Sequence, residues 1–321
     1  MAGPRPPLPP GQAVPEGLWT ASGSAAAIFR LAPAQLSDIG ERVPATRLTT
    51  AGTTLRTLVG VAFDRSGTMW ITSSDDHLLL SFEPAALASS GLKAATTVIM
   101  PNAGSLSAPS GLAFDRARGL WVANFDNGTL VRFDSAQLAV GGAPAPAVVL
   151  SIQGNPTSLA FDRDGALWVS DHLAQTIAQY RAADLVASGS PAPAVVLTEH
   201  GNSLPHPMGL AFDADGDLWV ANIGARNVVA FSPAQQAATG APQPHVTLSS
   251  TGTSLSIPVG LAFDAEGSLW VVGGSGSLTK FEQASLGASG TPEPSARLTV
   301  PGHSIFWTAA FWPRPAALPL N

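Results

Sequence analysis

The sequence predicts an all-β fold built from repeated units, and two observations carry this prediction. A tryptophan recurs at spacings of 51, 51, 47, 51 and 51 residues, at Trp19, Trp70, Trp121, Trp168, Trp219 and Trp270. Around it the residues alternate with period two, as in Leu120-Trp121-Val122-Ala123-Asn124, which is typical of a β-strand. A fixed period of this length indicates a ring or an array of identical supersecondary units.

The two ends of the chain predict a closed ring. Five tryptophans follow an Ala-Phe-Asp segment, whereas Trp19 follows none. Ala309-Ala310-Phe311 supplies the missing copy, 48 residues after Phe263. The last strand therefore joins the first three, which removes the open edges of a linear array. We expect a six-bladed β-propeller with four antiparallel strands per blade over residues 17–312, a proline-rich lead-in at 1–16 and a tail at 313–321.

The first two strands of each unit form a hairpin. In Gly111-Leu112-Ala113-Phe114 small and large residues alternate, and neither face is polar, so both faces should be buried between neighbouring sheets. Between the strands lies Asp-x-x-Gly, as in Asp162 to Gly165. Aspartate caps such a turn and glycine takes the positive φ.

A third strand, a helical turn and a fourth strand complete the unit. The third strand ends on an aromatic residue: Phe29, Phe82, Phe133, Tyr180, Phe231 or Phe281. A segment such as Ser135 to Leu138, with Asp134 in front as a cap, predicts a helical turn. A Pro-x-Pro segment such as Pro144/Pro146 introduces the fourth strand, and proline is tolerated at an exposed outer edge.

Composition excludes several classes of protein. The net charge is −6 and the only lysines are Lys93 and Lys280, so no basic stripe is present and nucleic acid is not expected as a partner. No segment approaches the roughly 20 apolar residues of a membrane span. The chain has no cysteine, and its first residues lack the apolar core of a signal peptide. We expect a monomer, located outside the cytoplasm after removal of a native signal.

The repeated phrase Gly-Leu-Ala-Phe-Asp-x-x-Gly-x-Leu-Trp-Val-Ala-Asn resembles the NHL-repeat propellers. Their relatives, the streptogramin (virginiamycin B) lyases and the gluconolactonase/senescence-marker propellers (SMP-30-like), share the resemblance. It covers residues 17 to 312. It implies the fold, but these propellers include enzymes, ligand binders and protein scaffolds.

The residues that carry catalysis in these enzymes are not matched here. The resemblance implies Thr-Glu after the blade tryptophan of a streptogramin lyase, with His and Glu acting on a divalent metal, yet the matching places are Ala123-Asn124 and Ala221-Asn222. A gluconolactonase-like enzyme implies a metal-binding Glu at the start of an inner strand. That place holds Val59, Ser110, Thr157, Met208, Val259 and Trp307. We therefore assign no cofactor and keep a divalent metal as the alternative.

The histidines indicate which face of the ring is functional. Loops from second to third strands and from fourth to following first strands should lie on one face. They hold five of the six histidines: His77, His172, His200, His206 and His303. Acidic residues, among them Asp171 and Glu199, follow the same pattern. Both types favour exposed loops in any protein; the alternative is a pocket ringed by imidazoles and carboxylates.

The third residue after each tryptophan is expected at the mouth of the channel. It is either a polar cap of the strand end or part of a ring of donors and acceptors. The loop before Pro156 is four residues shorter than its counterparts, which should open a notch near the fourth blade. Phe306 and Trp307 either form an apolar wall or plug the closing blade. The expected ligand-binding residues are Asn124, Asp171, His172, His206, Asn222, His303 and Trp307.

Two functions remain open from the sequence. The first is a propeller scaffold that binds a small molecule or a protein at the histidine-bearing face. The second is a metal-assisted lyase or lactonase near blades four and five, because Asp171, His172 and His206 are plausible metal ligands and also plausible acid–base groups.

Overall fold

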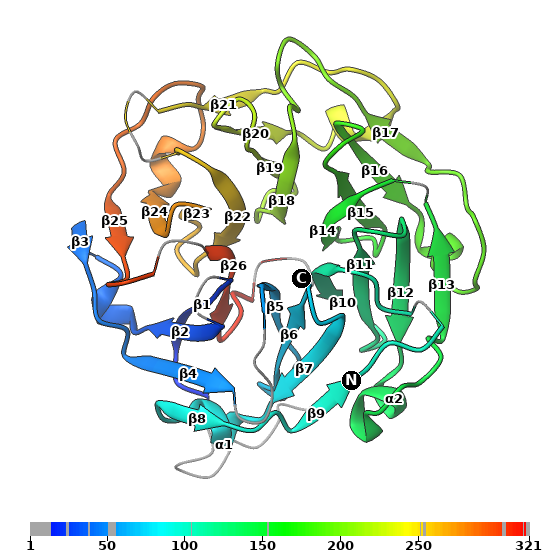
Figure 1. Cartoon of the computed structure of the whole chain (residues 1–321). Helices are drawn as coiled ribbons and strands as arrows, with labels where there is room; N and C mark the ends of the chain where they lie inside the picture. Colours follow the sequence, from blue (N-terminus) through cyan, green and yellow to red (C-terminus); the bar gives the residue numbers. More distant parts are fainter. Residues whose placement is uncertain are drawn as a thin grey trace.

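Six four-stranded antiparallel sheets surround a central axis in the computed structural model (Figure 1). It describes residues 14–23, 26–37, 39–50, 56–103, 105–152, 154–250, 252, 255–303, 306–316 and 318. The predicted six-bladed β-propeller is confirmed. Most of the predicted lead-in, residues 1–13, lies outside the described residues.

The inner two strands of each blade form the predicted hairpins. The innermost strands are β26 (Phe306–Trp312), β5 (Leu58–Phe63), β10 (Pro109–Phe114), β14 (Pro156–Phe161), β18 (Pro207–Phe212) and β22 (Pro258–Phe263). The second strands are β1 (Gly17–Ser22), β6 (Met69–Ser73), β11 (Leu120–Asn124), β15 (Leu167–Asp171), β19 (Leu218–Asn222) and β23 (Leu269–Gly273).

The outer half of each blade has a third strand, a helical turn and a fourth strand. The third strands are β2 (Ala27–Leu31), β7 (Leu78–Phe82), β12 (Thr129–Phe133), β16 (Thr176–Tyr180), β20 (Asn227–Phe231) and β24 (Ser277–Phe281). The helical turns are η1 (Pro33–Gln35), α1 (Pro84–Leu87), α2 (Ser135–Val140), η2 (Ala182–Leu185), η3 (Gln235–Ala237) and η4 (Gln283–Ser285). The fourth strands are β4 (Thr46–Thr50), β9 (Thr97–Ile99), β13 (Val148–Ser151), β17 (Val195–Leu197), β21 (Val246–Leu248) and β25 (Ala296–Thr299).

The ring closes as predicted, within the first blade. Strand β26 pairs antiparallel with β1, and the register places Phe311 opposite Leu18 and Ala310 opposite Trp19. The last strand of the chain is therefore the innermost strand of a blade whose other strands come from the N-terminus (Figure 1).

The aspartate of the repeated phrase joins the hairpin turn to the tryptophan. In the fourth blade, Asp162 accepts backbone hydrogen bonds from Asp164 (2.9 Å) and Ala166 (2.9 Å) on one carboxylate oxygen. Its other oxygen accepts the indole N–H of Trp168 at 3.0 Å. The same indole bond recurs at Trp121, Trp219 and Trp270. In these four blades the contact holds the inner hairpin in shape, which explains the repeated phrase there, whereas the Trp19 indole donates to the carbonyl of Pro15.

Each outer strand is bridged by a segment of the following blade. The short strands β3 (Ile39–Glu41) and β8 (Gly91–Lys93) pair parallel with β25 and β4. Single parallel bridges do the same at Ile99–Gly142, Leu150–Gly189, Leu197–Gly240 and Leu248–Gly290. The outer edges are thus partly covered by the neighbouring blade, whereas the sequence predicts exposed outer edges.

Glycine lets the innermost strands approach one another around the axis. A Cβ on Gly111 would lie 2.7 Å from the carbonyl oxygen of Thr157, and a Cβ on Gly260 would lie 2.8 Å from that of Trp307. The large residues pack between adjacent sheets: Ala113 and Trp121 of the third blade share one buried cluster with Leu159 and Phe161 of the fourth. The predicted pairing of small and large faces is therefore confirmed.

Candidate ligand-binding face

The predicted loops do meet at one end of the ring, which we call the loop face. The opposite end, which carries the Asp-x-x-Gly turns, is the turn face. In each of five blades the loop after the second strand donates a backbone hydrogen bond to the loop that leads into the first strand. The pairs are Ser74–Thr57, Phe125–Ala108, His172–Asn155, Ile223–His206 and Gly274–Ile257. Across the described segments, no helix is long and apolar enough to cross a membrane.

His172 and His206 lie together between the fourth and fifth blades. Their ring centroids are 4.8 Å apart with an interplanar angle of 39°, and Nδ1 of His206 lies 3.3 Å from the carbonyl oxygen of His172. Burial lowers the pKa of His172, and the positive charge that His206 can carry lowers it further. The backbone of Pro207 and the Asp171 carboxylate act in the opposite direction. These effects together favour the neutral form of His172.

Asp171 is occupied by its own loop. One carboxylate oxygen accepts the backbone N–H groups of Leu173 (3.1 Å) and Ala174 (2.9 Å). The other accepts the N–H of Asn155 at 3.2 Å. Within the described part of the chain, no three His, Asp or Glu side chains converge as a metal site would require. The residues proposed for a divalent metal therefore do not fit one.

Asn124 and Asn222 are fully buried, so the expectation that this position is exposed at the channel mouth is wrong for both. Both polar atoms of the Asn124 side chain have hydrogen-bond partners. Its Oδ1 accepts the N–H of Ser107 (3.0 Å), and its Nδ2 donates to the carbonyl of Ser105 (3.1 Å). Their role in ligand binding stays a prediction.

The fifth blade lacks one of these bonds. Nδ2 of Asn222 donates to the carbonyl of Ser203 at 2.7 Å, as in the third blade. Pro205 stands where Ser107 does and has no N–H, so Oδ1 of Asn222 has no hydrogen-bond partner.

His303 and Trp307 lie in the closing loop and strand, between the sixth and first blades. The His303 ring packs on Phe29 with centroids 4.5 Å apart, and burial lowers the pKa of His303, with Arg47 contributing. The Trp307 indole lies against Gly23, where a Cβ would be 2.8 Å from Nε1. The predicted residues thus form two groups, one around His172 and His206 and one around His303 and Trp307, while Asn124 stands apart with bonds only within the third blade.

Unpaired buried polar atoms mark the loop face. Five side-chain atoms of the described residues are buried without a hydrogen-bond partner: His172 Nδ1, Glu199 Oε1, Asn222 Oδ1, His303 Nδ1 and Trp307 Nε1. All five belong to loops or strand ends of the loop face, and four belong to predicted site residues. Buried polar groups are normally paired, so such a concentration needs a functional or solvent explanation.

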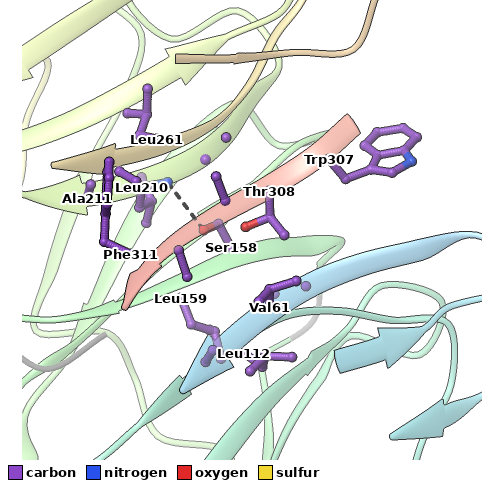
Figure 2. Close-up of a pocket in the computed structure, with 18 of the residues that line it drawn as sticks. Val61, Leu112, Ser158, Leu159, Leu210, Ala211, Leu261, Trp307, Thr308 and Phe311 are labelled. Carbon is purple, nitrogen blue, oxygen red and sulfur yellow. Dashed lines mark hydrogen bonds between the residues drawn. The ribbon is translucent and has the colours of Figure 1, made fainter. Parts of the chain in front are cut away.

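The central channel is narrow and apolar. At one level it is surrounded by Val61, Leu112, Leu159, Leu210, Leu261 and Ala309. Figure 2 shows the first five of these residues around one space, with Trp307 and Phe311 toward opposite ends of β26. Its cavity volume is about 130 Å³. Pockets for drug-sized ligands usually measure about 300–1,000 Å³, so such a ligand does not fit inside.

Two larger clefts lie on the turn face. One, of about 480 Å³, lies between the third and fourth blades and is lined by Arg116, Trp121 and Phe161 among others. The second, of about 530 Å³, lies between the sixth and first blades beside Glu266 and Trp312. A ligand could also bind in these clefts, so a binding test must distinguish contact at the turn face from contact at the loop face.

These features define a six-bladed β-propeller with a narrow hub and an irregular loop face. No family model and no curated protein matches the sequence. A catalytically inactive virginiamycin B lyase from Staphylococcus aureus, solved with quinupristin, is similar at 12% identity and a TM-score of 0.58, covering 86% of this chain and 83% of that one. A streptogramin B lyase is similar at 13% identity and a TM-score of 0.55, covering 86% and 82%.

A chain of the nidogen/laminin complex has the same architecture. The identity is 14% and the TM-score 0.65, and the match covers 92% of this chain and 97% of that one. The predicted resemblance to streptogramin lyase propellers is confirmed at the level of fold. At these identities the likeness concerns the fold alone.

Sequence reasoning missed the contrast between Asn124 and Asn222. The signal was present, because the loop that ends at Ala108 has Ser107 where the loop that ends at His206 has Pro205. Aligning the two loops residue by residue would have predicted the missing hydrogen bond.

Proposed function

We propose that this propeller is a binding scaffold without lyase activity, and that its loop face contacts a protein or another molecule too large for the hub. The centre of contact is the junction of the fourth and fifth blades. The observation that carries the proposal is the set of unpaired buried polar atoms, three of which, on His172, Glu199 and Asn222, belong to this junction. Such atoms gain hydrogen bonds from bound water, or from a partner whose binding rearranges the loops that cover them.

Apolar side chains at the same face support a macromolecular contact. Leu173, next to His172, is 59% exposed, and Ile257 is 39% exposed. Interfaces combine exposed apolar anchors with polar groups that become paired on binding. The loops vary in chemistry from blade to blade on a constant frame, which is how repeat scaffolds form one asymmetric binding surface.

The metal-assisted lyase is the second candidate, because two similar structures are lyases. Asp171 already accepts three backbone hydrogen bonds, which argues against a metal at this place. Incubation of the chain with quinupristin, followed by chromatography and fragment-ion mass spectrometry, separates the two candidates, because ring opening by elimination leaves the mass of the intact molecule unchanged. We expect quinupristin to remain intact. Its opening by wild type, lost in His172→Ala/His206→Ala, would establish the lyase instead.

Binding can be tested with peptides selected on immobilised wild-type protein. We expect a peptide whose affinity falls at least tenfold in the His172→Ala/His206→Ala variant. His245→Ala is the matched control, since His245 lies outside the loop face and contacts Asp217. Selected peptides that bind the double variant and wild type equally would overturn the proposed site.

A further inference from the structure

The hub of the ring contains a cavity inside the channel. Its lining is mostly apolar, and of the predicted loop-face residues only Trp307 also lines it. Among the described lining residues, Arg314 is the only charged one. Five blades contribute a branched aliphatic residue at one level, namely Val61, Leu112, Leu159, Leu210 and Leu261, and the first blade contributes only Ala309. The missing side-chain volume at Ala309 helps to leave space in the hub.

The C-terminal segment covers one end of this space. Arg314, Pro315 and Leu318 line the cavity together with Phe263 and Phe311, which lie at or next to the turn-face ends of their strands. Leu318 packs against the buried cluster that includes Phe263. A molecule would therefore reach the hub from the loop face.

Two hydroxyl side chains interrupt the apolar lining at one level, in addition to Thr157 and Arg314 elsewhere in the cavity. Ser158 and Thr308 occupy the place that glycine takes in the other four blades, and they come from opposite sides of the ring. Figure 2 shows both hydroxyl groups turned toward the same space. The Ser158 hydroxyl oxygen accepts a hydrogen bond from the backbone N–H of Leu210 at 3.2 Å. The hub thus offers hydroxyl groups without an unpaired charge.

We propose that the hub binds one small uncharged apolar molecule of about the size of benzene, an aryl or short branched alkyl group. The volume of about 130 Å³ matches this class. An engineered protein cavity of about 150 Å³, lined by aliphatic and aromatic side chains, stays free of water and binds benzene or xenon. The aliphatic ring offers a charged ligand nothing that compensates for lost hydration, and the charged Arg314 lies at the end covered by the C-terminal segment.

Crystals of the wild-type protein pressurised with xenon test this site directly. We expect one xenon peak among Val61, Leu159 and Leu261, and a rise in Tm when benzene is added in solution. Ala309→Leu should fill the hub and abolish both responses. Val61→Leu introduces the residue that four other blades carry at this place, so it should fold normally and weaken both responses.

The outcomes separate this site from the proposed loop-face function. The His172→Ala/His206→Ala variant should keep the xenon peak and the benzene response unchanged. A wild-type hub without xenon would overturn the proposal. So would a benzene response that is equal in wild type, Ala309→Leu and Val61→Leu.

Discussion

The indole of Trp168 packs edge-on against the phenyl ring of Phe212 in the next blade, with centroids 6.3 Å apart and an interplanar angle of 71°. The same arrangement joins Trp219 to Phe263 and Trp270 to Phe311. The tryptophan and phenylalanine of the repeated phrase therefore form one contact between adjacent blades. This contact explains why both residues recur with the same period.

Replacing one of these tryptophans should destabilise the whole ring. Trp168 is 1% exposed, and Trp168→Ala removes both its packing and its bond to Asp162. We expect a loss of about 3–5 kcal/mol in the free energy of unfolding, measured by urea denaturation. Trp121→Ala and Trp219→Ala should lower the free energy of unfolding by a similar amount. A variant with unchanged stability and lost peptide binding would show that the residue serves binding and not the frame.

Closure through β26 can be tested by truncation. Deleting residues 305 to 321 removes the innermost strand of the first blade and exposes the edge of β1. We expect aggregation or loss of the cooperative transition in a melting experiment. A truncated chain with the melting curve of wild type would contradict closure in the first blade.

One turn carries an unfavourable residue. Arg118 has φ 69°, where the equivalent turns place Gly67, Gly165, Gly216 and Gly267. Arg118→Gly should raise the free energy of unfolding by about 0.5–1 kcal/mol. Glycine removes the steric strain of the left-handed backbone from the folded state, and this gain exceeds the conformational entropy that glycine adds to the unfolded chain. The reverse control is Gly165→Ala at φ 84°, where there is room for a Cβ, with Ala182 3.9 Å away. Gly165→Ala should lower the free energy of unfolding in the same denaturation assay. A change of the same sign and size in both variants would contradict the claim that the left-handed backbone at these turns favours glycine.

Stability should fall in mild acid. The pKa of His172 is lowered by burial and by His206, so the folded protein binds fewer protons than the unfolded chain, whose histidine has a pKa of about 6.5. This contribution is complete above that pKa and is lost as the pH falls from it toward the lowered value of the folded state. His172→Gln should flatten the pH dependence of unfolding between pH 7.5 and 5. An equally steep curve would show that His303 or other groups carry the effect.

The frame was predictable because it repeats. The contact of Asp162 with Trp168 recurs in three other blades and imposes one spacing on the chain. The Ala-Phe-Asp segment missing before Trp19 revealed the closure. The outer bridges at Gly189 and Gly240 depend on contacts between blades, and no single unit displays them. The buried state of Asn222 was also hidden, since a polar residue at a strand end predicts exposure, and its bond to Ser203 forms only in the folded loop.

The central claim is that partners bind at the junction of the fourth and fifth blades on the loop face. Amide hydrogen exchange of the wild-type protein with and without a selected peptide tests it most directly. We expect added protection in residues 172–175 and 199–206 and no change in the turn at 213–216. Protection confined to the turn face, for instance in the cleft beside Arg116 and Phe161, would contradict the claim.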